Sequence, residues 1–312
     1  MIELIEKEIS NLPLGSTPKS LYDPIRYIMK LGGKRLRPML VLTGYQLYKS
    51  DVESVAKYAA AVEAFHNFTL MHDDIMDNAP LRRGKPTVHE KYNSNTAILS
   101  GDVMLVKVYD MFLSLPDHQL KEVLRLFNKT ASEVCEGQQM DMDFETMKKV
   151  SEKEYLEMIR LKTAVLLGFS LELGAILADA PKEDRKALYE FGVNIGLSFQ
   201  LMDDLLDVYG DQKKFGKAVG GDIVSNKKTY LLIKAFRKKN AELNKWLSLR
   251  KFDKKKKVEA VKKIYDSANV RNLTIKKSEE YYNKAIRCLD DIVPLKKQSL
   301  VDFASWLSSR QK

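Results

Sequence analysis

The stretch NFTLMHDDIMD, residues 67–77, joins an apolar run with helical spacing to three aspartates, the first acidic cluster (Asp73, Asp74 and Asp77). A second stretch, GLSFQLMDDLLD at residues 196–207, repeats this design and ends in the second acidic cluster (Asp203, Asp204 and Asp207). On a helix, positions i and i+4 lie on one face, so the outer two aspartates of each cluster can converge. Like charges held this close destabilise a helix by roughly a few tenths of a kcal/mol unless a cation neutralises them.

A divalent cation explains why carboxylates recur at this spacing. Mg²⁺ binds through one or two carboxylates and keeps other positions for water and substrate phosphate. We therefore predict two helices whose acidic clusters face each other across an apolar cavity and bind magnesium. The alternative is a pair of acidic helix ends in solvent. The apolar run that leads into each cluster argues against it, because it indicates a largely buried helix.

Helical periodicity covers most of the 312 residues, and only 15 Gly and 9 Pro interrupt it. Apolar residues recur every three or four positions in seven segments, and no segment shows the alternation typical of a strand. The segments are 54–72, 95–115, 119–134, 152–177, 185–208, 228–238 and 273–289. No stretch has the composition of an interdomain linker. We predict a single all-α domain, residues 1–312, with about ten or more helices around a central cavity.

Composition limits the partners and the compartment. The net charge of +10 suits an anionic partner, either a phosphorylated small molecule, a nucleic acid or a membrane surface. Two cysteines cannot form a disulfide framework, and no apolar run approaches the roughly 20 residues that span a bilayer. We expect a cytoplasmic protein without stable membrane insertion. The Lys-rich stretch 237–263, with its run 254–257, is interpreted as a solvated helical face rather than a nucleic-acid patch, because it has few aromatics for base stacking.

Basic loops complement the acidic clusters. GGKRLRP at 32–38 breaks the chain and restarts a helix at Pro38, where a positive helix end favours anions. LRRGKP at 81–86 begins four residues after Asp77, which suggests a phosphate bridged between metal and guanidinium. GDQKKFGKAVGGDIVSNKK at 210–228 is not a phosphate-binding P-loop, because its glycine spacing is one residue too long and Ala218 stands where Ser or Thr is needed. Each basic cluster, taken alone, could equally be a solvated loop.

Individual polar residues add to this pattern. Lys162 and Thr163 begin an apolar run, where an unpaired ammonium is costly to bury, so Lys162 either serves the site or extends to solvent. His66 shares a helical stripe with the first acidic cluster and is expected to face the same cavity. We interpret His72 as a packing residue or as one that supports the residues in contact with the ligand, and His89 as a loop residue. No histidine has a convincing Ser or Cys partner for nucleophilic catalysis.

These motifs together resemble the trans-isoprenyl diphosphate synthases, the polyprenyl synthetase family. The resemblance rests on GGKRLRP, HDDIMD followed by LRRGKPTVH, GQQMD at 137–141, Lys162-Thr163 and FQLMDDLLD, in the expected order from about residue 31 to residue 228. It implies the all-α type I isoprenoid synthase fold and a homodimer. It also implies a Mg²⁺-dependent prenyltransferase with about three ions per site when substrate is bound.

The resemblance also implies a role for each matching residue. The metal ligands would be Asp73, Asp77 and Asp203, with Asp74 and Asp207 nearby. The isopentenyl diphosphate would be held by Lys34, Arg37, His66 and Arg83. The allylic diphosphate would be held by Arg82, Lys162, Thr163, Gln200, Lys217 and Lys227. The catalytic set would be Asp73, Asp77, Asp203, Lys162, Lys217 and Arg82. Two anionic substrates would thus bind side by side, one through metal and bases and the other through bases alone.

The expected reaction is head-to-tail condensation of isopentenyl diphosphate with an allylic diphosphate. Ionisation of the allylic carbon–oxygen bond would give a carbocation in a dry pocket, and the isopentenyl double bond would attack it. Phe68 lies five residues before Asp73, about 7.5 Å back along the helix, and Thr69 lies one turn below Asp73. A bulky Phe68 would form the floor of the pocket, which is typical of C15 to C20 synthases. We predict geranylgeranyl diphosphate as the main product, with farnesyl diphosphate as the second choice.

Three other functions are compatible with parts of the sequence. A class I terpene cyclase would use the first acidic cluster but would not need the basic set for a second diphosphate. A non-catalytic subunit of a heteromeric synthase would usually lack one of the two clusters. Binding of nucleic acid through the positive charge would be steeply salt-dependent. Synthesis of a short-chain prenyl diphosphate accounts for the most motifs.

Overall fold

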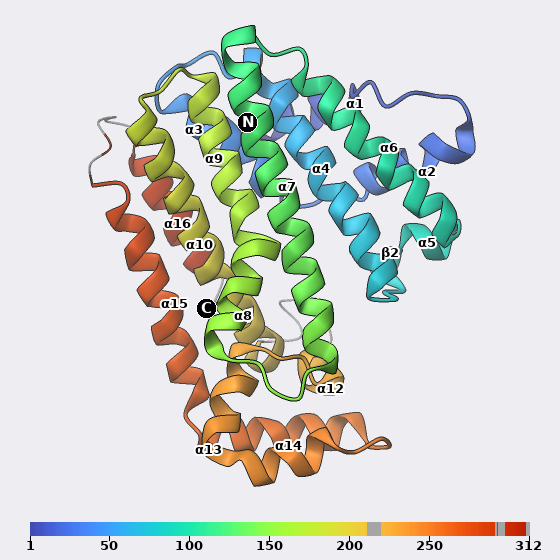
Figure 1. Ribbon diagram of the computed structural model, residues 1–312, viewed down its shortest axis with the longest axis vertical. Helices are drawn as coiled ribbons and strands as arrows, with labels where there is room; N and C mark the ends of the chain where they lie inside the picture. Colours follow the sequence, from blue (N-terminus) through green and yellow to red (C-terminus); the bar gives the residue numbers. More distant parts are fainter. Residues whose placement is uncertain (211–219, 291, 293–296, 310–312) are drawn as a thin grey trace. The chain divides into compact units, whose positions relative to one another are not determined.

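The computed structural model describes residues 1–210, 220–290, 292 and 297–309. Within these residues the chain forms fifteen α-helices, one 3₁₀ turn, one π turn and a hairpin of two short strands (Figure 1). The predicted all-α class is therefore confirmed. None of the helices in the described part of the chain is long and apolar enough to cross a membrane.

The chain folds into two compact units. Unit 1 comprises Met1–Lys129 and Phe169–Leu188, and unit 2 comprises Thr130–Gly168 and Tyr189–Lys312. Three long helices contribute residues to both units, and they are α7 (Asp117–Thr146), α9 (Val165–Leu177) and α10 (Lys182–Tyr209). Because each unit is described by itself, the single domain expected from the sequence stays a prediction.

Unit 1 is built around α4 (Ala56–Met76), which packs against α1, α3 and α6. Its remaining elements are α1 (Ile2–Ser10), α2 (Lys19–Lys30), α3 (Leu36–Gln46), η1 (Glu53–Val55), β1 (Leu81–Arg82), β2 (Lys85–Pro86), α5 (Val88–Lys91) and α6 (Ser94–Phe112). Small residues bring backbones close together: a Cβ on Gly174 of α9 would lie 2.1 Å from the Val41 carbonyl oxygen of α3. This packing buries the apolar face of α4 and holds its acidic end in place.

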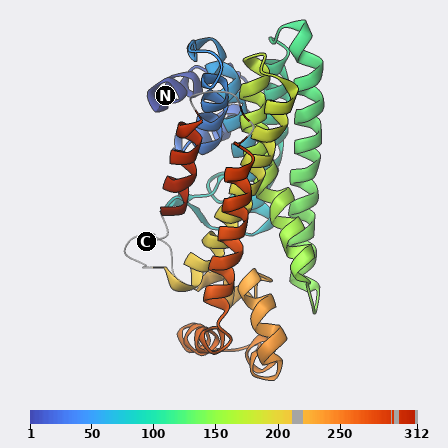
Figure 2. The same cartoon turned by 90° about the vertical axis from the view of Figure 1, so that its left-hand side faces the viewer.

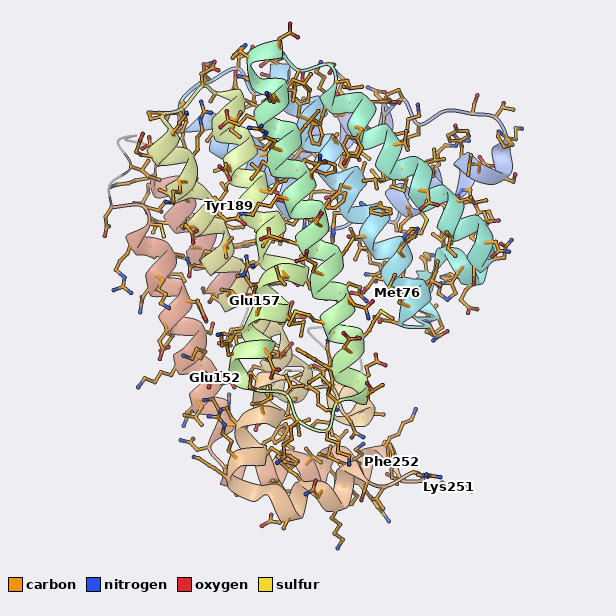
Figure 3. The ribbon with its side chains drawn as sticks, in the orientation of Figure 1. Met76, Glu152, Glu157, Tyr189, Lys251 and Phe252 are labelled. Atoms are coloured by element: carbon orange, nitrogen blue, oxygen red, sulfur yellow. The ribbon has the colours of Figure 1, made fainter. Side chains whose placement is uncertain are left out.

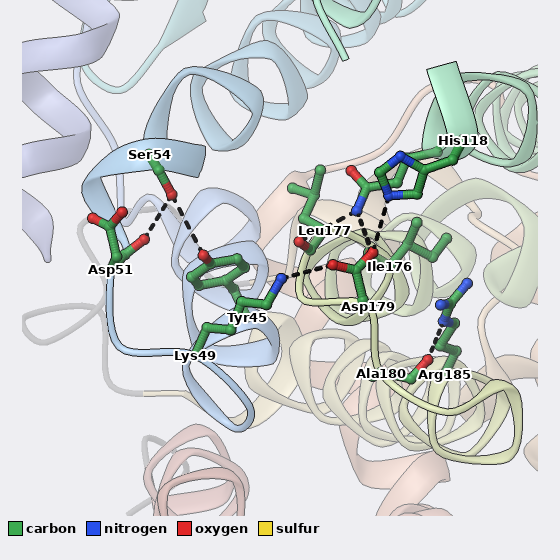
Figure 4. A network of polar contacts seen from close by, with 11 residues as sticks. Tyr45, Lys49, Asp51, Ser54, His118, Ile176, Leu177, Asp179, Ala180 and Arg185 are labelled. Carbon is green, nitrogen blue, oxygen red and sulfur yellow. Dashed lines mark hydrogen bonds and ion pairs between the residues drawn. The ribbon is translucent and has the colours of Figure 1, made fainter. Parts of the chain in front are cut away.

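A polar network ties α3, α7 and α9 together within unit 1 (Figure 4). The carboxylate of Asp179 accepts hydrogen bonds from Lys49 Nζ at 2.7 Å and Gln119 Nε2 at 2.8 Å, and His118 lies 3.3 Å away. These cationic and amide neighbours lower the pKa of Asp179 to about 2. The network fixes the turn between α9 and α10, where Asp179 has a left-handed backbone with φ 57°.

Unit 2 contains the second acidic cluster on the last turns of α10. Its other elements are α8 (Glu152–Ile159), the π turn η2 (Arg160–Ala164), α12 (Gly221–Ser225), α13 (Tyr230–Leu247), α14 (Lys254–Ser267), α15 (Val270–Arg287) and α16 (Gln298–Ser309). The helices α13 and α14 pack on each other and on one end of α15 (Figure 2). Glycines again permit close packing, because a Cβ on Gly196 of α10 would lie 2.6 Å from the Cα of Ala164.

The seven predicted helical segments are confirmed, but several local expectations are wrong. The helix after GGKRLRP begins at Leu36 rather than at Pro38, because Arg35 takes a left-handed N-cap conformation with φ 49° and its guanidinium is buried against Glu63 at 2.6 Å. The run 152–177 is interrupted by the π turn η2. His89 lies in the short helix α5 instead of a loop, and Lys257 of the Lys-rich run is fully buried instead of solvated.

Candidate functional site

The first acidic cluster occupies the last turn and C-cap of α4, near the exposed Met76 (Figure 3). Asp77 is exposed, the side chain of Asp73 is 20% exposed, and Asp74 is buried. Arg82 forms a bidentate ion pair with the buried Asp74 carboxylate, donating from Nε to Oδ2 at 2.8 Å and from Nη2 to Oδ1 at 2.7 Å. Arg82 also comes within 3.5 Å of Asp73. The middle aspartate thus anchors the arginine of β1. Of the outer two, Asp77 lies at the surface, whereas Asp73 is partly buried.

Arg82 is placed by the hairpin that follows α4. β1 pairs with β2 antiparallel, and the turn between the strands places Arg83 and Gly84 in left-handed conformations with φ 54° and 73°. The sequence contains no alternating strand pattern here because each strand has only two residues. The short hairpin folds the basic stretch back onto the acidic end of α4.

Three of the four residues expected to hold the isopentenyl diphosphate come together in unit 1. Arg37 Nη1 donates to His66 Nε2 at 3.0 Å, and a Cβ on Gly33 would lie 2.7 Å from Arg83 Nη2. Because arginine can only donate, His66 accepts through Nε2 and is neutral. Lys34 follows Gly33 and is exposed.

The positive charges of Arg37 and Arg83 repel each other and disfavour protonation of His66. Burial and, to a lesser degree, the charge on Arg83 lower the pKa of Arg37 to about 10, although the charge on Glu63 raises it. Burial and the neighbouring arginines hold the pKa of His66 well below its ordinary value. Among the described residues, the buried Nε of Arg37 has no hydrogen-bond partner. A cluster of cations with an unused buried donor is suited to bind an anion such as a diphosphate.

Phe68 and Thr69 lie below the first acidic cluster on α4. The Phe68 ring contacts Phe65 and His72, with ring centroids 5.7 Å and 4.8 Å apart. Phe68 is only partly buried, whereas Phe65 belongs to the core. Thr69 Oγ1 donates to the His66 carbonyl at 2.8 Å. The aromatic ring therefore covers one end of the apolar core of unit 1, and His72 is a packing residue as expected.

In the second acidic cluster the middle aspartate is again the buried one. Asp204 accepts hydrogen bonds from Tyr155 Oη at 2.6 Å and from Gln200 Nε2 at 3.0 Å. Gln200 in turn accepts from Thr163 Oγ1 at 3.3 Å. Asp203 is exposed, and Asp207 is half-buried. As in α4, the middle aspartate is held by neighbouring side chains and the outer two remain nearer the surface.

Lys162 is set by the π turn and by the GQQMD motif of α7. A Cβ on Gly137 would lie 2.2 Å from the Lys162 amide nitrogen, so only glycine allows this approach. The Lys162 ammonium donates to Asp141 at 2.7 Å, and neither side chain is more than 24% exposed. The Nε2 of Gln138 is buried and has no hydrogen-bond partner among the described residues. Lys162 is therefore paired with Asp141 rather than extended into solvent, and π turns are frequent at functional sites.

The segment after the second acidic cluster brings a further aspartate and Lys227 to it. The backbone N–H of Asp222 donates to Asp207 Oδ2 at 3.0 Å, and the backbone N–H of Lys227 donates to the Asp222 carbonyl at 2.9 Å. Burial raises the pKa of Asp204, Asp207 and Asp222, while the charge on Lys227 lowers all three. Lys217 lies outside the described residues.

The donor chemistry fits a hard divalent cation. Three buried or half-buried carboxyls with raised pKa values repel one another at the second cluster, and a bound cation would relieve this repulsion. Among the described residues, no three His, Cys, Asp or Glu side chains enclose a metal ion by themselves. Mg²⁺ does not need such a cage, because it keeps several waters and is completed by substrate phosphates.

The sequence located the clusters correctly but missed their supporting residues. The structure brings Arg37, His66 and Arg83 together in unit 1, and Thr163 and Gln200 in unit 2. Tyr155, Asp141 and Asp222 were not identified beforehand. GQQMD, which ends at Asp141, and GGD, which ends at Asp222, are the local signals for these two aspartates. Nothing near Tyr155 marks it as the partner of Asp204, 49 residues away.

Comparison with known proteins agrees with this geometry. The family model for polyprenyl synthetase matches residues 18–268. A short chain isoprenyl diphosphate synthase of Methanocaldococcus jannaschii is 50% identical over 218 residues, which cover 70% of this chain and 66% of that protein. A geranylgeranyl pyrophosphate synthase of Geoglobus acetivorans is 38% identical over 99% of this chain and 96% of its own. A crystal structure of a geranylgeranyl pyrophosphate synthase superposes with a TM-score of 0.93 at 43% identity, covering 100% of this chain and 97% of its own.

The fold and the two acidic clusters define an all-α prenyltransferase. The chain belongs to the polyprenyl synthetase family, and the family resemblance of its motifs is confirmed.

Proposed function

We propose that this protein is a cytoplasmic short-chain isoprenyl diphosphate synthase. It joins isopentenyl diphosphate to allylic diphosphates, and geranylgeranyl diphosphate is its main product. The observation that carries this proposal is the separation of two kinds of anion site. Arg37, His66 and Arg83 form no ion pair with a carboxylate among the described residues, since the neighbouring Glu63 is paired with Arg35, whereas Arg82, Lys162 and Lys227 each lie beside aspartates.

The set of Arg37, His66 and Arg83 suits isopentenyl diphosphate, whose diphosphate does not leave in the reaction. Arg37 would bind the diphosphate through the Nε that has no partner in the described residues. Arg83 and Lys34, which lie in the basic stretches LRRGKP and GGKRLRP, would bind it as well. The neutral His66 keeps the Arg37 guanidinium oriented by accepting from Nη1. The sequence offers no clear general base, so the proton lost after condensation would go to the departing pyrophosphate.

The mixed acidic and basic set suits the allylic diphosphate, whose carbon–oxygen bond breaks. Asp73, Asp77 and Asp203 would hold Mg²⁺, with Asp74 and Asp207 nearby, and magnesium would supply electrostatic stabilisation of the leaving pyrophosphate. Arg82, Lys162 and Lys227 would bind the same diphosphate directly, together with Lys217, Thr163 and Gln200. The proposal therefore requires both acidic clusters to act on one substrate.

Mutation of each acidic cluster tests this requirement. Asp203→Asn and Asp73→Asn should each lower kcat by at least about 100-fold, since removal of a single electrostatic stabiliser commonly costs ~10²–10³. Asp302→Asn, in α16 and outside both clusters, is a matched control that should retain full activity. Unchanged turnover in either cluster variant would show that the clusters do not share the reaction.

The residues below the first acidic cluster bear on product length. The aromatic ring of Phe68 below the first acidic cluster supports a short product, and relatives are named for both geranylgeranyl and geranylfarnesyl diphosphate synthesis. The decisive assay incubates the protein with isopentenyl diphosphate, each allylic primer in turn and Mg²⁺, followed by chromatography of the dephosphorylated products. A C20 alcohol is expected, and a C15 alcohol is the second choice.

The same assay without isopentenyl diphosphate separates a synthase from a terpene cyclase. A cyclase converts an allylic diphosphate alone into hydrocarbon, whereas a synthase needs both substrates for chain growth. No elongation with any primer, despite bound substrate, would instead indicate a non-catalytic subunit.

We also propose that the protein forms a homodimer through α6. Leu99, Val106 and Leu113 recur every seven residues on this helix and its C-cap and are 58%, 57% and 59% exposed. An apolar stripe of this kind is a common sign of an interface. Light scattering should give twice the chain mass of 35.7 kDa, and Val106→Glu should give a monomer. A wild-type chain that remains monomeric would refute the dimer without affecting the proposed reaction.

A further inference from the structure

Lys257 is an anomaly within the Lys-rich run. Lys254, Lys255 and Lys256 are exposed, but the Lys257 side chain in the first turn of α14 is fully buried. Burial lowers the pKa of its ammonium. Among the described residues, no carboxylate pairs with it. A buried ammonium with only neutral partners is costly, so its contacts need an explanation beyond solubility.

The contacts of Lys257 converge on the end of α12. Its Nζ donates to Asn226 Oδ1 at 2.6 Å and to the Val224 carbonyl at 3.2 Å. The ammonium also lies 4.1 Å from the centroid of the Phe252 ring, which is labelled at the tip before α14 in Figure 3. Three groups from two segments thus surround one charge, which ties the start of α14 to the C-terminal end of α12.

Asn226 is the residue that this charge holds. It is the C-cap of α12 with a left-handed backbone, φ 59° and ψ 30°, and its Nδ2 donates to the Leu247 carbonyl at 3.2 Å. Both polar atoms of the side-chain amide are therefore hydrogen-bonded, the oxygen to Lys257 and the nitrogen to the last turn of α13. A residue with a left-handed backbone changes the direction of the chain. The two hydrogen bonds of the Asn226 side chain therefore determine the direction of the next residue.

The next residue is Lys227. Its backbone N–H donates to Asp222, whose own N–H donates to Asp207 of the second acidic cluster. The positive charge of Lys227 attracts Asp204, Asp207 and Asp222 and thereby lowers the pKa of each carboxyl. The turn at Asn226 is thus the point from which Lys227 is directed to the cluster.

We propose that Lys257 is a positioning residue, which fixes the Asn226 turn and thereby holds Lys227 where it binds the allylic diphosphate. The identity of the anion rests on the proposed function, whereas the mechanical link from Lys257 to Lys227 rests on the contacts alone. Lys257 touches no substrate in this arrangement and acts through Asn226.

Steady-state kinetics distinguishes positioning from general stability. Lys257→Met keeps the length of the side chain but removes its charge and hydrogen bonds. The KM for the allylic diphosphate should rise about tenfold, equivalent to ~1.4 kcal/mol, while the KM for isopentenyl diphosphate changes by less than about twofold. Lys256→Met, at the exposed neighbouring position, is the matched control and should behave as the wild type. Equal increases in both KM values, or no increase, would overturn the proposal.

Asn226→Gly tests the link from the other side. Glycine keeps the left-handed backbone but removes both side-chain hydrogen bonds, so the KM for the allylic diphosphate should rise by a similar factor. The double variant should be no worse than either single variant, because both break one link. Independent additive effects would overturn the proposal.

Hydrogen exchange gives a readout that does not depend on turnover. In the substrate-free protein, amides of residues 221–227 should exchange faster in Lys257→Met than in Lys256→Met, and protection equal to that of the wild type would overturn the proposal. If the wild-type protein makes no prenyl diphosphate, the proposed function fails, and the exchange experiment still tests the link between Lys257 and Asn226.

Discussion

Asp74→Asn should destabilise the protein much more than Asp77→Asn, although both remove one charge from the same cluster. The Asp74 side chain is 2% exposed and receives Arg82 through contacts of 2.7 Å to 2.9 Å, whereas Asp77 is exposed. Removing one partner of a buried ion pair costs about 3–5 kcal/mol. The asparagine keeps one carbonyl acceptor, which returns ~1 kcal/mol.

Two further observations lower the expected value. Arg82 is 23% exposed, so its unpaired guanidinium is partly hydrated, and Asp73 at 3.5 Å remains as a second partner. Burial raises the pKa of Asp74 even though Arg82 lowers it, while the same ion pair raises the pKa of Arg82. The directions differ because desolvation offsets part of the attraction on the buried carboxylate. We therefore expect a loss of about 2 kcal/mol for Asp74→Asn.

The assay is urea unfolding at pH 7 without magnesium or substrate, so that stability is measured apart from activity. For a chain of 312 residues, a loss of about 2 kcal/mol corresponds to a fall in Tm of roughly 3 °C. Asp77→Asn should stay within about 0.5 kcal/mol of the wild type, because it weakens the repulsion from Asp73 and the attraction to Arg82 together. Equal stabilities of the two variants would refute the assignment of Asp74 as the buried anchor of Arg82.

Three other predictions address product length and pH. Phe68→Ala should shift the product distribution to longer chains on chromatography, because the ring below the first acidic cluster is removed, and unchanged lengths would exclude Phe68 as the floor. The folded-state pKa of His66 lies below its ordinary value of 6.5, so unfolding takes up a proton and stability falls as pH drops below about 6.5. His66→Asn should therefore lose less stability between pH 7 and pH 5 than the wild type, as measured by urea midpoints. The pKa of Asp179 is lowered to about 2, so its contribution is present above the ordinary value of 3.8 and is lost as pH falls toward 2. Its side chain is half exposed, so water screens its contacts with Lys49 and His118 (Figure 4), and Asp179→Asn should cost less than about 1 kcal/mol at pH 7. A larger loss would show that water does not screen these contacts.

Local patterns explain why the helices were predictable. The segment 54–72 became α4, and 273–289 became α15, because apolar spacing depends only on neighbouring residues. Short or irregular elements were not predictable in this way. The β1–β2 hairpin has two residues in each strand, and the π turn at Arg160–Ala164 continues the apolar spacing of the helices around it through Leu161 and Ala164.

Long-range contacts explain the residues that were misjudged. Lys257 stands in a run of four lysines, and nothing in that run distinguishes the buried one from its exposed neighbours. Its acceptor Asn226 is 31 residues away, so the burial follows from how α12 and α14 pack. Arg35 in GGKRLRP is similar, because its partners Glu6 and Glu63 come from two other helices.

The amino-acid sequence alone determined that two helices end in aspartate clusters with bases nearby, and these motifs were enough to indicate a family. Only the tertiary structure decided the role of each aspartate within a cluster. Asp74 and Asp204 are buried and hydrogen-bonded, while their neighbours Asp73 and Asp203 are more exposed. Helical spacing places the outer aspartates on one face, but burial of the middle one depends on partners such as Arg82 and Tyr155 that other elements supply. That information lies in packing between segments, which no local pattern contains.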